Sequence, residues 1–511
     1  MAVTPDTEII LLKVPLELDN KNQLTFSNST AQYNYFYNCP KIIADNCTYQ
    51  RKDSIVRFPA HIDSILEYNY CMYQNEYYSN KWFYCFITDK KYINDNMTEL
   101  TIKTDVFQTW QFDLTYKRCF VEREHVNDDT IGLHTVPEQL EIGDYVQNSV
   151  STFGFNDYCF LIQVQKYYHT TSVTLATNLG GIPQAGGFYL CDTFSEVANI
   201  IDEYNNPSNG VSIDNITNIW IIPKRCVNYS NVDEYNRWGG QSSPIEETHS
   251  INKITSLNGY TPKNKKLLTY PYIALLMSNN NGTSNTLRIE EFSSSDCEFE
   301  IVSVPTVGGS IKCAPKYYKN HGSGGYEEEK IIAGKFPTLS WSTDAYTNWL
   351  TQNGVNISVG FATDIGMTIG NAFSGNVGGA LNGAMGVINR MAQIEQQKFA
   401  PNTAKGNTNA GDVATANYTN EFYFYMLSIK SEYAKMIDDF FTMYGYKVNS
   451  VKIPNITGRS NWNYVKTIDS IIIGNVPQND LQEIKNMFDD GVTLWHNTST
   501  FLDYSQSNNI V

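Results

Sequence analysis

The feature that most constrains this chain is an uncharged segment, residues 366–388, which reads GMTIGNAFSGNVGGALNGAMGVI. The chain around it is acidic and rich in tyrosine, with a formal net charge of −16 and 35 Tyr among 511 residues. Between residues 355 and 388 the only charged side chain is Asp364, and eight positions are glycine. Because each glycine costs a helix in water about 1 kcal/mol relative to alanine, this segment needs support from tertiary packing or from a bilayer.

Two rows of side chains run through this segment at helical spacing. The apolar residues that we expect to enter a membrane are Ile357, Phe361, Ile365, Ile369, Phe373, Val377, Leu381, Met385, Val387 and Ile388. The parallel row of small residues contains Ala362, Gly366, Gly370, Ser374, Gly378 and Gly386. Small residues at this spacing let helices approach closely in lipid. A straight helix over 355–388 would be about 50 Å long, against a hydrocarbon core of about 30 Å, so conditional insertion is favoured over a permanent span.

Aromatic residues flank the segment on both sides. Trp341, Tyr346 and Trp349 precede it and are candidate interfacial residues, and an aromatic run at 422–425 follows it. Amphipathic aromatic side chains gather at membrane interfaces. On pattern alone, a buried core helix or an oligomer interface explains the same residues equally well, because apolar periodicity does not distinguish these cases.

The composition favours a fold that is mainly β, of the α+β type, with a few helices. Aromatic residues make up 13% of the chain, and such residues suit the half-buried surface of a sheet. The length predicts several lobes: 1–150 and 151–335 as two β-rich lobes, 345–415 as an apolar loop insertion, and 420–511 as a helix with C-terminal strands.

The charge balance argues against a protein that grips nucleic acid, since such binding depends on Lys and Arg neutralising phosphates. We interpret the short basic cluster at Lys263, Lys265 and Lys266 as a solvated loop.

The N-terminal stretch carries acidic residues where a signal peptide needs positive charge, so no secretion signal is expected. The ten cysteines form no C-x-x-C motif and lie mostly in apolar runs, which predicts reduced, buried thiols made in a cytosol.

Local patterns predict individual elements. An aromatic strand over 81–88 and a second strand through Leu100, Ile102 and Val106 should form a hairpin around the turn at 94–96. Short strands are expected at 158–164, 219–222, 270–277, 299–304 and 492–495, and an exposed loop or lobe boundary at 321–325.

We expect a helix over about 421–443, with Phe424, Ile429, Met436 and Phe440 on its apolar face. A second helix should run from Asp480 to about Asp490, with Asn479 as its N-cap, Leu481, Ile484 and Phe488 on its apolar face, and Gly491 as its stop.

Catalytic and metal-binding patterns are not apparent. The chain contains no G-x-S-x-G, no Walker A sequence and no H-E-x-x-H, and its seven histidines lack ligand spacing. We therefore predict no catalytic residues, no metal and no cofactor. The charged run Glu122, Arg123, Glu124 and His125 is the best candidate for acid–base groups, with both glutamates expected on one face of a strand. Adjacent charges on a strand usually lie at a surface or an interface.

An ordered series of short stretches resembles the tail knob, or distal tube, proteins of small short-tailed phages of the Bacillus type. These stretches are Gln32–Phe36, Asn80–Tyr84, Thr104–Trp110, Phe120–Val126, Gly474–Leu481 and Gly491–His496. They extend from about residue 30 to 500, with a poorly matched middle.

The resemblance implies a structural virion protein at the tail tip, synthesised in the host cytoplasm and not an enzyme. It implies a homohexameric, β-rich tube that contacts the lower collar or tail tube proteins and through which phage DNA passes without specific binding. It also implies that a long hydrophobic loop, here at about 345–415, plugs the tube and then enters the lipid of the host membrane. Six copies at −16 each carry a net charge of −96, so we expect lumen-facing side chains to be acidic or neutral and to repel DNA. Two alternatives stay open: a tail-associated hydrolase of cell wall or polysaccharide, and a receptor-binding tail module.

Overall fold

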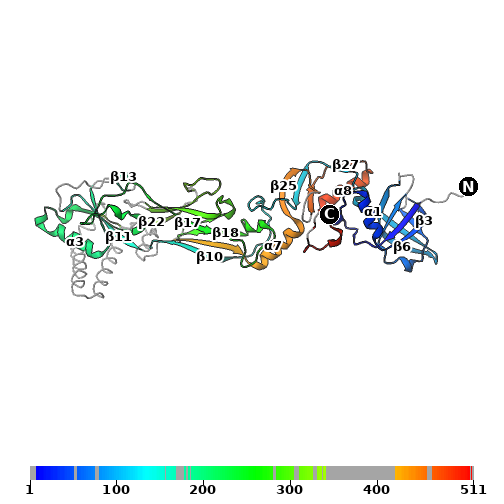
Figure 1. Ribbon diagram of the computed structural model, residues 1–511, viewed down its shortest axis with the longest axis horizontal. Coiled ribbons are helices and arrows are strands. Elements are labelled where there is room, and N and C mark those ends of the chain that lie inside the picture. The colour runs from blue at the N-terminus through cyan, green and yellow to red at the C-terminus, as the bar shows by residue number, and fades with distance from the viewer. Residues whose placement is uncertain are drawn as a thin grey trace, which may run out of the picture. The chain divides into compact units, whose positions relative to one another are not determined.

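The computed structural model describes residues 7–50, 54–74, 80–155, 157–168, 178–179, 182–183, 186–279, 283–303, 310–325, 331–335, 338–340, 421–456, 463–506 and 508. The chain divides into two compact units. The first contains Met1–Gly143, Gly259–Leu268 and Ser431–Val511, and the second contains Asp144–Asn258 and Thr269–Lys430. Strands dominate both units (Figure 1), which confirms the expected fold class. The lobe limits drawn from the sequence stay a prediction.

The first unit begins with a closed six-stranded barrel. In barrel order its strands are β1 (Thr7–Leu12), β3 (Lys41–Gln50), β4 (Ile55–Phe58), β7 (Met97–Thr104), β6 (Trp82–Asn94) and β5 (Tyr70–Gln74). Side chains alternate across each strand, so Ile9 and Leu11 of β1 fill the barrel while Ile10 and Leu12 lie in a second core cluster outside it. Closure leaves the barrel without free edges.

Helix α1 (Ser29–Asn38) lies beside the barrel (Figure 1) and was not expected from the sequence. Asn28 caps it by accepting a hydrogen bond from the Ala31 amide at 2.9 Å. Phe36 then stacks on Tyr70 of β5 with ring centroids 5.6 Å apart. The helix therefore covers the outer core cluster that β1 and β5 present.

The hairpin of β6 and β7 confirms the predicted pairing around the turn after Asn94, although β6 extends well past the expected end at residue 88. The expectation that Val106 belongs to the second strand is wrong, because Val106 starts the short helix α2 (Val106–Trp110). Asp105 accepts a hydrogen bond from the Gln108 amide at 3.0 Å, and this cap turns the chain out of the strand.

A five-stranded sheet completes the first unit. Its order is β2 (Asn22–Leu24), β28 (Val492–Trp495), β26 (Asn463–Ile468), β9 (Cys119–Glu124) and β25 (Tyr446–Lys452), and a short pair, β8 (Leu114–Tyr116) with β27 (Ile472–Gly474), continues beside it. Helix α8 (Gln478–Asp490) packs on one face through Leu481, Ile484 and Phe488, as predicted. The predicted cap is wrong: α8 begins before Asn479, with Pro477 at the N-cap position.

The predicted helix over 421–443 is wrong in its first half. Residues Glu421–Ile429 form strand β24 of the second unit, and helix α7 (Ser431–Tyr444) of the first unit follows. Burial alternates along β24, which is the period of a strand. Met436, assigned to the apolar face of the helix, is exposed, whereas Ile437 and Phe441 are buried.

Helix α7 fixes the inserted segment 259–268 in the first unit. Asp438 is fully buried and accepts hydrogen bonds from the Tyr260 hydroxyl at 2.7 Å, the Lys263 amide at 2.8 Å and the Asn264 amide at 2.9 Å. These donors satisfy a carboxylate that would otherwise be costly to bury. The segment then ends in the 3₁₀ turn η7 (Lys265–Leu268).

Where it is described, the second unit contains separate antiparallel sheets and the twelve-residue helix α3 (Phe194–Asn205). One four-stranded sheet has the order β10 (Tyr145–Gly154), β24, β18 (Ile273–Ser278) and β19 (Ser284–Leu287). A five-stranded sheet has the order β16 (Arg237–Trp238), β14 (Gly187–Cys191), β11 (Tyr158–Val164), β15 (Ile216–Pro223) and β23 (Thr338–Ser340). Another four-stranded sheet has the order β17 (Ile245–Asn252), β20 (Asp296–Ser303), β21 (Ser310–Pro315) and β22 (Ile331–Lys335). A two-residue pair, β12 (Asn178–Leu179) with β13 (Ile182–Pro183), completes the set.

The strand predicted at 158–164 has the bounds of β11, and residues 321–324 form the expected exposed loop. All ten cysteines are free and nine are buried, as expected.

Asp105 makes the stability of the first unit depend on pH. Burial raises the pKa of Asp105 to about 6, against the opposing hydrogen bonds from Gln108 and Tyr70, whereas an unfolded aspartate titrates near ~3.9. The folded protein therefore holds a proton that the unfolded chain has lost, and the free energy of unfolding falls as pH rises from ~4 to about 6. We expect Asp105→Asn to remove this slope in denaturant titrations at several pH values. The exposed control Asp89→Asn should retain the slope, and an unchanged slope in Asp105→Asn would contradict the assignment.

Candidate functional site

The residues predicted to act on membranes lie outside the part of the chain that the structure describes. This holds for the apolar and glycine residues from Ile357 to Ile388 and for the interfacial candidates Trp341, Tyr346 and Trp349. Their roles stay predictions. Within the described ranges, no helix is both long and apolar enough to cross a membrane.

The charged run at the end of β9 is the candidate site that the structure does describe. Glu122 faces outward and its Oε2 lies 3.0 Å from the Lys466 Nζ, whereas Arg123, Glu124 and His125 are buried. The expectation that the charged run lies at a surface or an interface is wrong for these three residues, which are buried within the chain. Neighbouring segments supply partners that satisfy their charges and polar atoms, so burial is tolerated.

Glu138 is the centre of a buried ion cluster around Arg123. Its carboxylate accepts hydrogen bonds from the guanidinium of Arg123, the ammonium of Lys266 and the amide of Lys447, the last at 2.9 Å. The Glu138 and Lys266 side chains are 1% and 3% exposed. Burial lowers the pKa of Lys266, and the Glu138 carboxylate opposes this shift. Lys266 is therefore no solvated loop residue, which corrects the sequence interpretation, although Lys263 and Lys265 are exposed as expected.

His125 and Glu124 are held by the sheet rather than free to react. The His125 Nδ1 accepts a hydrogen bond from the Tyr464 amide at 2.9 Å, and its Nε2 donates to the Thr442 carbonyl at 3.1 Å. This pair of contacts defines a neutral imidazole with both nitrogens engaged. The carboxylate of Glu124 pairs with Lys452 of β25.

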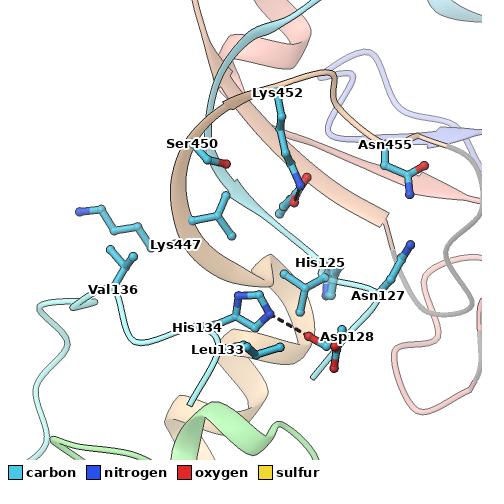
Figure 2. A pocket seen from close by; sticks show the side chains of 13 residues that line it. His125, Asn127, Asp128, Leu133, His134, Val136, Lys447, Ser450, Lys452 and Asn455 are labelled. Atoms are coloured by element: carbon cyan, nitrogen blue, oxygen red, sulfur yellow. Dashed lines mark hydrogen bonds and ion pairs between the residues drawn. The ribbon is translucent and has the colours of Figure 1, made fainter. Parts of the chain in front are cut away.

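A polar pocket of about 370 Å³ lies beside this cluster. Figure 2 shows its labelled side chains, which come from residues 125–136 and from β25 with the residues after it. The His134 Nε2 donates to the Asp128 carbonyl at 2.7 Å (Figure 2), and the hydroxyl and amide of Thr130 hold the pKa of Asp128 below its usual value. Lys447 and Lys452 also line the pocket, so charges of both signs surround it.

The geometry of this site suits a structural role. Glu122 and Glu124 are each paired with a lysine. The pairing of β9 with β26 is also irregular between Val121 and Arg123. The two carboxylates therefore do not form the free pair of a glycosidase. Among the described residues, no group of three or more His, Cys, Asp or Glu side chains could hold a metal ion. Glu138 joins β9, η7 and β25, and sequence reasoning missed it because its partners are distant in the chain.

Comparisons with known proteins identify the class. A family model described as the N-terminus of the Caudoviral major tail protein matches residues 6–115, and one described as the C-terminal domain of tail knob protein gp9 of Bacillus phage phi29 matches residues 236–509. These matches define a structural protein of phage tails. The second match covers more than half of the chain, which therefore belongs to the family of phage tail knob proteins.

Individual relatives agree with this assignment and with the resemblance noted in the sequence. The tail knob protein gp9 of Bacillus phage phi29 is 27% identical, and that of Bacillus phage B103 is 25% identical, each over 98% of both chains. The solved structure of the tail knob protein gp12 of bacteriophage C1 shares the fold, with a TM-score of 0.64 at 16% identity over 99% of this chain and 100% of that one. As a tail knob protein, this chain is a component of the virion.

Proposed function

We propose that six copies of this chain form a tube at the far end of the tail and that phage DNA leaves through it. In the resting virion the apolar segment at about 345–415 closes the tube, and on infection it enters the lipid of the host membrane. The uncharged stretch 366–388 within a tail-tip protein carries this proposal, because an acidic chain must keep an apolar stretch of this length out of water until it meets lipid, and a tube can do so. The protein acts as a conduit and not as an enzyme.

Two further observations support a tube. The closed barrel and the adjoining sheet give the first unit a rigid β-framework, which a tube wall needs. The net charge of −16 per copy gives six copies a strong negative field, which would repel DNA from a lumen wall and keep it moving. Contact with DNA is then transient and independent of sequence, and the lasting partners are neighbouring tail proteins such as the lower collar or tail tube.

The number of copies tests the tube directly. We expect the purified protein to appear in negative-stain images as rings with sixfold symmetry, with a mass six times the 58.0 kDa of one chain in native mass spectrometry. Single copies at micromolar concentration, or rings of another number, would contradict the proposed assembly. A ring whose lumen is lined by Lys and Arg would contradict the proposed mode of DNA passage.

A further inference from the structure

The five-stranded sheet of the first unit and the short pair of β8 with β27 expose a group of aliphatic side chains on one face. On the opposite face, Val465 of β26 and Ile472 of β27 pack with α8 in one core cluster. Side chains alternate along a strand, so Ile468, Ile471 and Ile473 point away from α8. All three are roughly half exposed, at 47%, 49% and 49%.

The same face continues across two more strands. Phe120 of β9 pairs in register with Ile468 of β26 on one side and with Val451 of β25 on the other. Cross-strand partners project from the same face, so these three side chains form a row across three strands. Val451 is 61% exposed, and Ile453, two residues on, is 55% exposed. We call the surface formed by Phe120, Val451, Ile453, Ile468, Ile471 and Ile473 the aliphatic face.

The aliphatic face departs from what solvent-facing sheets normally carry. Antiparallel sheets with one wet side place polar residues on that side. Scattered exposed aliphatic residues need no explanation, but a contiguous group marks an interaction surface. Five of the six residues are valine or isoleucine, which are already stiff in a strand and therefore lose little rotamer entropy when a partner covers them.

The edge of the sheet points to a protein partner. β25 ends the strand order, and in the described part of the chain no strand pairs with its outer side. Glu138 accepts from the Lys447 amide there, but Val451 lies farther along the strand and Ile453 directly follows its end. An edge that exposes aliphatic side chains pairs readily with another chain unless it is covered. Lipid can cover apolar side chains but cannot satisfy strand backbone groups.

The charges beside the aliphatic face point to a second copy of this chain. Lys117 and Arg118, which connect β8 to β9, are both exposed, and Asp469 is the acidic residue in the turn after β26. Lys466 and Lys452 on the adjoining strands add no net charge, because they pair with Glu122 and Glu124. This surface is therefore basic on balance, whereas the whole chain carries a net charge of −16. The remaining surface of another copy is strongly acidic and is the complementary partner.

We propose that the aliphatic face is the contact by which one copy of this chain binds the next. The proposal rests on the proposed tube and assigns the surface that assembles it. The contact is head-to-tail: the aliphatic face of one copy meets a different, acidic surface of its neighbour, which is the arrangement that closes into a ring.

The test removes apolar area while keeping the strands. In Val451→Thr/Ile468→Thr/Ile473→Thr, threonine preserves strand propensity. We expect roughly a tenfold or greater rise in the concentration at which assemblies dissociate in sedimentation velocity, with an unchanged circular dichroism spectrum and melting temperature of the single copy. The matched control, Leu66→Gln/Ile93→Thr/Leu133→Gln, alters three side chains that are also exposed, at 58%, 40% and 57%, and should assemble like the wild type.

A photocrosslinking amino acid at Ile468 separates this inference from the proposed hexamer. Crosslinked pairs of chains in wild-type assemblies of any number support the aliphatic face, even if that number is not six. Sixfold rings that give no crosslink and that persist in the threonine variant overturn the inference and leave the tube standing. Wild-type protein that stays a single copy overturns both. Binding to anionic vesicles that the threonine variant loses while its rings remain intact would show a membrane contact and overturn the inference.

Discussion

Replacing Glu138 by glutamine should lower the free energy of unfolding of the first unit by about 3–5 kcal/mol. The Glu138 carboxylate is the acceptor for both Arg123 and Lys266, whose side chains are 11% and 3% exposed. A neutral amide in its place removes the negative charge that Glu138 provides to these two buried cations, and burial limits how well water can compensate. Removing one partner of a buried ion pair is far more costly than losing a surface pair for this reason.

Denaturant unfolding, followed by tryptophan fluorescence, measures this effect. The control is Glu141→Gln, three residues away at an exposed position, which should change the free energy of unfolding by no more than ~0.5 kcal/mol. A second variant, Lys266→Met, removes one of the two cations and should destabilise the unit less than Glu138→Gln does, because Arg123 keeps its carboxylate. A loss below ~1 kcal/mol in Glu138→Gln would mean that the cluster is open to water.

The sequence predicted strands best where an apolar run is bounded by turn residues. β11 and β28 have the predicted limits, and the hairpin of β6 and β7 forms around the expected turn. In these places local chemistry and tertiary packing favour the same structure. The N-cap of α8 was misplaced because the helix begins two residues earlier than Asn479 suggests, with the Pro477 carbonyl accepting the first helical hydrogen bond from the Leu481 amide and no side chain capping the first turn.

The errors arise where tertiary packing decides between two local options. The run from 421 to 444 contains both a strand and a helix, and the strand shows itself only in the alternation of Phe422, Phe424 and Met426. Helix α3 was missed although Thr193 and Glu196 form a capping box, which is a signal readable from the sequence. Helix α1 offers a weaker signal, because aromatic residues fill it and only Phe36 and Gln32 are buried.

The candidate site could not be assembled from the sequence at all. Arg123, Glu138, Lys266 and Lys447 meet although more than 300 positions separate the first from the last. No periodicity links residues on separate elements of a β-rich fold. Lys266 carries one local hint, since Leu267 and Leu268 follow it directly and both are buried. The uncharged segment 366–388 is the opposite case, because its composition alone sets it apart from the rest of the chain.

Deleting residues 350–410 should leave the ring intact and abolish its action on membranes. Every side chain of the aliphatic face and every partner of Glu138 lies outside the deleted range. The deleted range, in contrast, holds the apolar row and the small-residue row that would pack within lipid. We expect the full-length protein to release dye from liposomes of bacterial lipid and the deletion variant to release no more than vesicles without protein do. In phage particles that carry the variant, tails should form normally but DNA should not enter the cell.

A variant of unchanged length separates hydrophobicity from mere presence of the loop. Ile365→Asn/Ile369→Asn/Phe373→Asn keeps the chain length and the glycines but interrupts the apolar row, and polar groups inside a bilayer cost several kcal/mol each. It should lose dye release to the same extent as the deletion. If the deletion dissolves the ring while the asparagine variant assembles and still permeabilises vesicles, the segment serves assembly rather than membrane entry. If both variants keep the ring and both lose dye release, hydrophobic contact with lipid is what the segment contributes, because the ring, the barrel and the ion cluster are the same in all three proteins.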